Sequence, residues 1–167
     1  LRRLDRSLAA IRMSNPLDHA QWQVVLERLA AQLPGQDQSI YLQVTRGAYA
    51  VRNHVIPQQV KPNVIAFTSV NPPRDPASAR RGIKAITVPD NRWHRCDIKA
   101  TTLLANVLAR AQATEEGADE AILVRDGAAM EGSASNLFIV SNGLLLTPPD
   151  SEELLPGITR DLVLELA

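Results

Sequence analysis

Apolar residues recur at three- and four-residue spacing in four stretches of the chain, which is the pattern of helices with one buried face. The first helix is predicted within LRRLDRSLAAIRM, ending near the breaker cluster Ser14–Pro16. The second is predicted from a cap at Asp18 to about Leu33. Its buried stripe comprises Trp22, Val25, Leu26 and Leu29. A third, central helix follows Lys99, and a fourth begins after Gly157.

Strands are predicted where β-branched and aromatic residues gather, in the segments 40–47, 63–70 and 82–90. Further along, short apolar runs are joined by Asp126–Gly127 and Asn142–Gly143, which are typical hairpin turns. Helices packed on such sheets form an α+β fold, and the hairpins make its sheets largely antiparallel.

Three prolines lie among polar residues in Asn71–Ser78, which makes this segment the best linker candidate in the chain. We therefore predict a smaller N-terminal domain over 1–71 and a larger domain over 79–167, joined by a linker at 72–78. The chain begins inside an apolar helical pattern without a methionine, and it ends partway through another. We expect the sequence to be an internal portion of a longer protein.

The composition suits a folded domain and narrows the classes of partner. Hydrophobic residues make up 45% of the chain and the formal net charge is zero, so nothing favours nucleic acid or an anionic membrane surface. No apolar run approaches membrane-spanning length. The single cysteine, Cys96, excludes an intrachain disulfide and fits a reducing cytoplasm. The three histidines lack the spacing of metal ligands, so no metal site is expected.

Two charged residues admit both a structural and a chemical interpretation. Lys99 precedes the central helix, where it is either a solvated charge or a nucleophilic amine. A cation at a helix N-terminus opposes the macrodipole, which lowers the pKa of an amine and favours Schiff-base chemistry. Glu131 stands in MEGSASN, which is either a polar loop or a wall of small residues beside a planar ligand. In the second case its carboxylate anchors a ring nitrogen.

Two further motifs are suited to anions. LLPGITR places Gly157 before a helix N-terminus, where backbone N–H groups and the Thr159 hydroxyl form a phosphate site. The glycine can equally serve only to start the helix. Arg52 and His54 lie in a loop between strands, either as a carboxylate clamp or as an ordinary surface pair.

Five motifs occur in an order and at spacings that resemble one family over essentially the whole chain. They are LRRL, QVTRG followed by RNH, RWHRCDIK, EGSASN and LPGITRD. They resemble the class IV, or fold-type IV, pyridoxal-phosphate-dependent aminotransferases, and most closely the D-amino acid aminotransferases. The resemblance implies a two-domain fold-type IV aminotransferase fold with pyridoxal 5′-phosphate as its cofactor. It also implies ping-pong transfer of amino groups between D-amino acids, such as D-alanine or D-glutamate, and 2-oxo acids.

The resemblance assigns roles to individual residues. Lys99 matches the lysine that forms the internal aldimine with the cofactor and moves the proton between substrate and cofactor. Glu131 matches the carboxylate that pairs with the pyridine nitrogen, and Arg3 matches an arginine that binds the phosphate. The other cofactor-binding positions that it implies are Ser135 and Leu155 at the ring and Gly157, Ile158 and Thr159 at the phosphate.

Arg52 and His54 match the carboxylate-binding pair of the D-amino acid enzymes. In that family the pair reaches across from the partner subunit, so the resemblance implies a homodimer. Branched-chain L-amino acid aminotransferases and 4-amino-4-deoxychorismate lyases share the lysine and the glutamate, and they are the alternative enzymes. A non-catalytic cofactor-binding domain is the alternative outside enzymes. The expected partners are small molecules, with neither nucleic acid nor a membrane among them.

Overall fold

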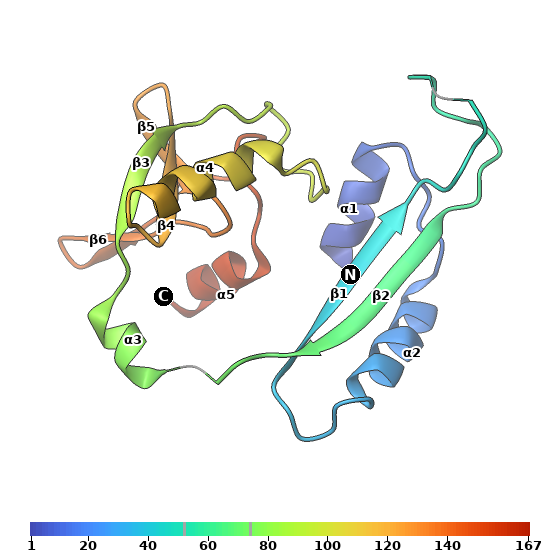
Figure 1. Cartoon of the computed structure of the whole chain (residues 1–167), viewed down its shortest axis with the longest axis horizontal. Coiled ribbons are helices and arrows are strands. Elements are labelled where there is room, and N and C mark those ends of the chain that lie inside the picture. Colours follow the sequence, from blue (N-terminus) through green and yellow to red (C-terminus); the bar gives the residue numbers. More distant parts are fainter. Residues whose placement is uncertain (52, 74) are drawn as a thin grey trace. The chain divides into compact units, whose positions relative to one another are not determined.

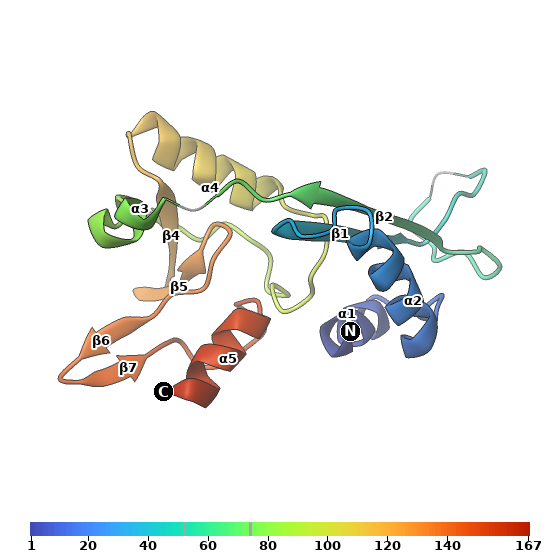
Figure 2. The same ribbon diagram turned by 90° about the horizontal axis from the view of Figure 1, so that it is seen from below.

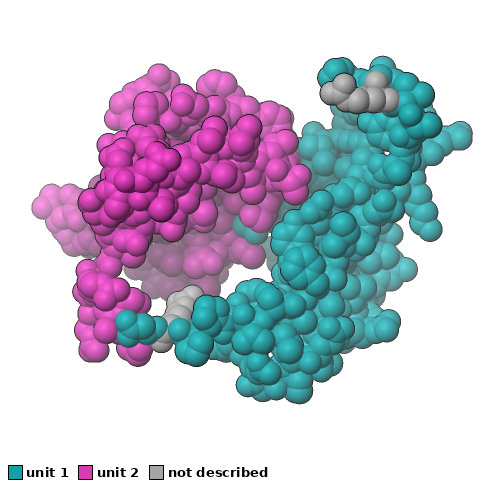
Figure 3. Space-filling view, viewed as in Figure 1, with its two compact units in different colours: residues 1–75 teal, residues 76–167 magenta. Residues whose placement is uncertain are grey.

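The chain divides into two compact units, which Figure 3 colours separately. They are Leu1–Asp75 and Pro76–Ala167, and the computed structural model describes residues 1–51, 53–73 and 75–167. The division falls inside the predicted linker at 72–78, where helix α3 (Pro76–Arg81) begins. That this segment links two domains stays a prediction.

The first unit is a β-hairpin with helices (Figure 1). It contains α1 (Arg2–Ala10), α2 (His19–Ala30), β1 (Gln38–Thr45) and β2 (Asn63–Val70). The two strands pair antiparallel over their whole length, and α2 lies along one face of the hairpin (Figure 2).

The sequence predicted the start of α2 correctly but placed its end too far along the chain. The Asp18 side chain accepts from the Gln21 backbone N–H at 2.8 Å, and the Gln21 side chain accepts from the Asp18 N–H, which completes a capping box. The helix ends at Ala30 rather than near Leu33. The Gln38 side chain donates to the carbonyls of both Ala30 and Leu33, so the last carbonyls are satisfied without another helical turn.

The second unit combines a three-stranded sheet with helices. It contains α3, β3 (Ala85–Pro89), α4 (Leu104–Glu115), β4 (Glu120–Arg125), β5 (Ala128–Gly132), β6 (Ile139–Ser141), β7 (Leu144–Leu146) and α5 (Ile158–Leu166). Strands β3 and β4 are parallel and are connected through α4, whereas β4–β5 and β6–β7 are antiparallel. The core between α4 and the sheet is built from Val88, Ala113, Ala118, Ala121 and Leu123.

The observed elements confirm the predicted α+β fold with largely antiparallel pairing. Both predicted hairpin turns are present, at Asp126–Gly127 and Asn142–Gly143. All four of these residues have positive φ, from 49° to 79°, which is the backbone that a two-residue type I′ turn requires. Within the described residues, no helix combines the length and apolar character needed to cross a membrane.

The central helix differs from the prediction in where it begins. Helix α4 starts at Leu104 with Leu103 as its N-cap, so Lys99 lies in the preceding loop and not in the first helical turn. Because the helix dipole acts mainly within that first turn, it does not account for an altered Lys99 amine. The helix turns Ala109 and Ala113 to the sheet, and Leu104 and Leu108 on its other side are 71% and 60% exposed.

Candidate functional site

A cavity of about 710 Å³ lies within the second unit, in the size range of small-molecule sites. Its wall comes from the loop before α4, the first turns of α4, and the turn that follows β5. Lys99 and Glu131, which are 32 positions apart in the sequence, both line it. Ser135 and Leu155, which the family resemblance places at the cofactor ring, line it as well.

Glu131 is held in place by several hydrogen bonds. It lies near the end of β5, is only 5% exposed, and accepts hydrogen bonds from three groups. Arg92 Nη1 donates to Oε1, Asn136 Nδ2 donates to Oε2 at 3.1 Å, and the Leu155 N–H donates to both oxygens at 3.1–3.2 Å. A carboxylate has about four acceptor positions. These four contacts occupy that number, so a further donor such as a ring N–H would share an oxygen with one of them.

The electrostatics of Glu131 favour such a donor. Burial raises the pKa of Glu131 above its usual value, although the hydrogen bonds from Arg92 and Leu155 and the charge of Arg92 act in the opposite direction. Because ionising Glu131 at this buried position is costly, an additional cation or hydrogen-bond donor would stabilise its carboxylate.

Arg92 is itself held by a buried acid that the sequence interpretation missed. Asp90, at the end of β3, accepts from Arg92 Nε at 2.9 Å and from Arg92 Nη2 at 3.0 Å. Arg125, from the end of β4, forms an ion pair with the same carboxylate at 3.0 Å. Burial opposes ionisation of Asp90, but the two arginines overcome it and hold the pKa of Asp90 below its usual value.

Ser135 is positioned by Glu120, a buried glutamate on β4. The Ser135 hydroxyl donates to Glu120 Oε2 at 2.9 Å, and Glu120 Oε1 accepts from both the hydroxyl and the backbone N–H of Ser133. Asn106 on α4 donates to the Ser133 carbonyl at 2.8 Å, which fixes the turn from a second side. A side chain at Gly132 would place its Cβ 2.1 Å from Ser135 Oγ, so it would push the Ser135 hydroxyl away from Glu120.

Removing the charge of Glu120 is expected to destabilise the fold in a pH-dependent way. Burial raises the pKa of Glu120, but hydrogen bonds from Ser133, Ala121 and Ser135 more than offset it, and the net pKa lies below the usual 4.5. Its contribution is therefore present above that value and is lost as the pH falls through the folded-state pKa. Glu120→Gln should lower the free energy of unfolding by roughly 1–3 kcal/mol near neutral pH.

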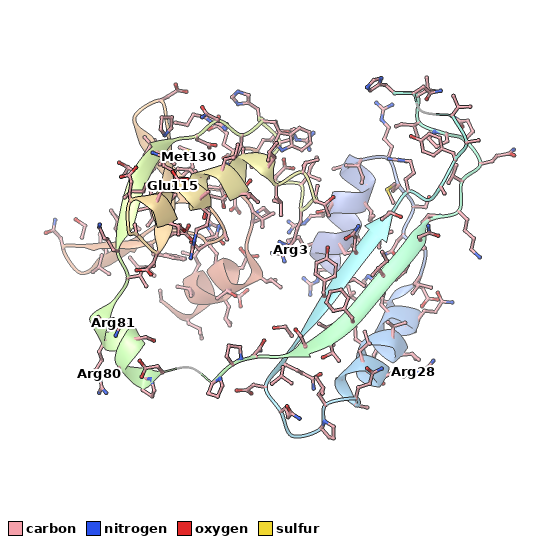
Figure 4. The ribbon with its side chains drawn as sticks, in the orientation of Figure 1. Arg3, Arg28, Arg80, Arg81, Glu115 and Met130 are labelled. Atoms are coloured by element: carbon pink, nitrogen blue, oxygen red, sulfur yellow. The ribbon has the colours of Figure 1, made fainter. Side chains whose placement is uncertain are left out.

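Urea unfolding of the full-length protein at neutral and acidic pH measures this difference. Glu115→Gln, at the exposed end of α4 (Figure 4), is the control and should match the wild type. The Glu120→Gln deficit should shrink as the pH falls below the usual 4.5 and through the lowered folded-state pKa, because the wild-type carboxylate then loses its charge. A deficit equally large at both pH values would show that its charge does not hold the turn.

The predicted phosphate residues lie at the start of α5. Gly157 is the N-cap of this helix, and Ile158 and Thr159 form its first turn, as the sequence predicted. These three residues are not among those that line the cavity. Asn136 connects the two places, because its Nδ2 donates both to Glu131 and to the Leu155 carbonyl. Its Oδ1 would lie 2.0 Å from a Cβ at Gly157, so any larger residue there would displace the Asn136 side chain.

The remaining predicted residues belong to the first unit. Arg3 lies on α1 (Figure 4), and His54 lies in the loop between β1 and β2. Arg52 lies outside the described residues. Their proposed contacts with phosphate and substrate therefore stay predictions.

The comparisons with known proteins agree on one family. The family model for amino-transferase class IV matches residues 1–167. A D-alanine aminotransferase from Listeria monocytogenes serotype 1/2a is 39% identical over 166 residues, which are 99% of this chain. The chain spans only 57% of the length of that relative.

Solved structures of related enzymes share the fold. A branched-chain aminotransferase from the thermophilic archaeon Thermoproteus uzoniensis, solved with norvaline, has a TM-score of 0.82 and 27% identity, covering 99% of this chain and 57% of that one. A putative 4-amino-4-deoxychorismate lyase from Legionella pneumophila has a TM-score of 0.84 and 23% identity, covering 99% and 60%. This chain therefore belongs to the class IV aminotransferase family.

Proposed function

We propose that this chain carries the cofactor site of a pyridoxal-phosphate-dependent aminotransferase that acts on D-amino acids and 2-oxo acids. The observation that supports it most is the cavity shared by the Lys99 amine and the Glu131 carboxylate. The D-alanine aminotransferase relative, at 39% identity, favours D-amino acids. The branched-chain enzyme and the lyase, at 27% and 23%, make those activities the alternatives.

The residues present in the cavity fit the cofactor. The Glu131 carboxylate lines the cavity and would accept a ring N–H, and the turn at Gly132–Asn136 brings small side chains to the wall where a flat ring would lie. Leu155 lines the same wall with an apolar side chain. Gly157, Ile158 and Thr159, with Arg3, are proposed to hold the phosphate, since a helix N-terminus presents backbone N–H groups to anions.

The proposed reaction divides the work between the cofactor and the protein. When bound, pyridoxal 5′-phosphate supplies the aldehyde that receives the amino group and the ring that takes up the electron pair left on substrate Cα. Lys99 Nζ would hold the cofactor covalently, and the same amine would move a proton between substrate Cα and the cofactor. Glu131 accepts the ring N–H, and its negative charge favours the protonated ring.

Two further proposals concern the complete protein. Arg52 and His54 would bind the substrate carboxylate, and we propose that they do so from the partner subunit of a homodimer. The outward leucines of α4 offer apolar surface that a second copy would bury on association. A cytoplasmic location, expected from the single cysteine, is part of the same proposal.

A direct assay of amino transfer tests the proposed function. Full-length protein is incubated with pyridoxal 5′-phosphate, 2-oxoglutarate and either D-alanine or L-leucine, and chiral chromatography follows the glutamate formed. D-Alanine should react, and the glutamate should be the D enantiomer. Reaction of L-leucine alone would support the branched-chain alternative, and release of pyruvate from aminodeoxychorismate would support the lyase. A protein that binds the cofactor but turns over none of these would be the non-catalytic alternative.

A further inference from the structure

Buried charged groups next to Glu131 form a network to which the proposed reaction assigns no role. Arg92 donates from one guanidinium to two acids, through Nη1 to Glu131 and through Nε and Nη2 to Asp90. Its side chain is 7% exposed, that of Asp90 is fully buried, and that of Glu131 is 6% exposed. Burying these three charges costs desolvation free energy, which the same charges on a solvated protein surface would not cost.

Each member of the network has a fixed partner on more than one element. Arg92 Nη2 also donates to the Glu153 carbonyl at 3.0 Å, and Arg125 Nη2 donates to the Arg92 carbonyl at 3.0 Å. Arg125 Nη1 contacts Glu153 and His94 at the outer end. The guanidinium of Arg92 is therefore held in one orientation, with its Nη1 directed at Glu131.

The arrangement bears on where one proton resides. A ring nitrogen beside Glu131 shares a single proton with it, either as a carboxylic acid beside a neutral ring or as a carboxylate beside a protonated ring. Burial alone favours the first pair, because it penalises charge on both partners. Arg92 contacts the carboxylate itself, so its charge stabilises the carboxylate more than it disfavours a more distant ring cation.

We propose that Arg92 is a positioning residue that keeps Glu131 as a carboxylate and so places the shared proton on the ring nitrogen of the bound cofactor. Asp90 and Arg125 orient Arg92 and balance its charge. This inference rests on the proposed function, because it requires the cofactor ring to bind beside Glu131. Other charged or titratable groups around the site are His94, Cys96 and Lys99 in the loop, Arg110 on α4, Glu120 on β4 and Glu153 before α5.

The proton is located by ¹⁵N NMR of full-length protein loaded with ring-¹⁵N pyridoxal 5′-phosphate. Arg92→Gln keeps a hydrogen-bond donor of similar reach and removes the charge. The nitrogen signal should lie in the protonated range in the wild type and move toward the unprotonated range in Arg92→Gln. Arg92→Lys keeps the charge, so its nitrogen signal should resemble that of the wild type. The kcat values should follow the same order, with the wild type and Arg92→Lys above Arg92→Gln.

Arg95→Met is the matched control, because Arg95 lies in the same loop but pairs with Asp97 and Glu152 and does not line the cavity. Its signal should not move. A protonated nitrogen in folded Arg92→Gln would overturn the inference while leaving the proposed function intact. If Arg92→Gln does not fold, an unprotonated nitrogen in Arg92→Lys would overturn it instead. A wild-type protein that binds no cofactor would overturn the proposed function and this inference with it.

Discussion

Replacing Lys99 with alanine is expected to reduce transamination by at least about a thousandfold, the upper range for losing a positioned acid–base group. The proposed role makes the loss large because one amine does two tasks, covalent attachment and proton transfer. Among the described lysines, only Lys99 lines the cavity together with Glu131, so no other lysine has the same access. The measurement is the rate of D-alanine consumption with 2-oxoglutarate, together with far-UV circular dichroism to show that the fold is retained.

Lys84→Ala provides the comparison for Lys99→Ala. Lys84 is an exposed lysine whose Nζ donates to the Glu116 carbonyl, and it does not line the cavity. This variant should keep the wild-type rate. A Lys99→Ala protein that turns over substrate as fast as Lys84→Ala would remove Lys99 from the reaction.

Replacing Glu131 with glutamine is expected to lower kcat by about a hundredfold or more, a typical cost of losing one preorganised electrostatic partner. Glutamine has the same size and still accepts the Leu155 N–H, but it carries no charge to stabilise a protonated ring. Arg92 keeps its two hydrogen bonds to Asp90, so we expect the fold to survive. Steady-state kinetics with D-alanine measures the change.

Two comparisons make the Glu131 result specific. Glu115→Gln, a glutamate on the exposed end of α4, should behave as the wild type. The loss in Glu131→Gln should appear in kcat more than in KM, because the ring charge matters most when the Cα–H bond breaks. An unchanged kcat would show that Glu131 does not stabilise the ring.

Local sequence signals predicted the features that local backbone chemistry decides. The Asp-Gly and Asn-Gly turns were found because both central positions of such turns need positive φ, which few residues tolerate. The cap at Asp18 was predicted correctly because the Asp18 side chain bonds the backbone N–H of Gln21, only three residues along the chain. The start of α4 was misplaced, since the apolar spacing of Leu103 and Leu104 does not show whether the residues before them are helical.

Contacts between distant segments were beyond the reach of such signals. Arg92 and Glu131 are 39 residues apart, and nothing in either local pattern pairs them. Asp90, Arg92, Glu120, Arg125 and Asn136 were therefore given no individual role by the sequence interpretation. Strand β4 did carry a weak signal, because Glu120 and Arg125 stand at the two ends of an otherwise apolar strand. Charged residues at the ends of a buried strand are worth testing as parts of a site.

Identifying the residue that holds the cofactor is the sharpest test of the proposed site. Full-length protein loaded with pyridoxal 5′-phosphate is reduced with borohydride, digested and analysed by mass spectrometry. The reduced cofactor should be attached to the peptide that contains Lys99, and no attachment should be found in Lys99→Ala. Attachment to another lysine, or the same labelling in Lys99→Ala, would contradict the central claim that Lys99 and Glu131 share one cofactor site.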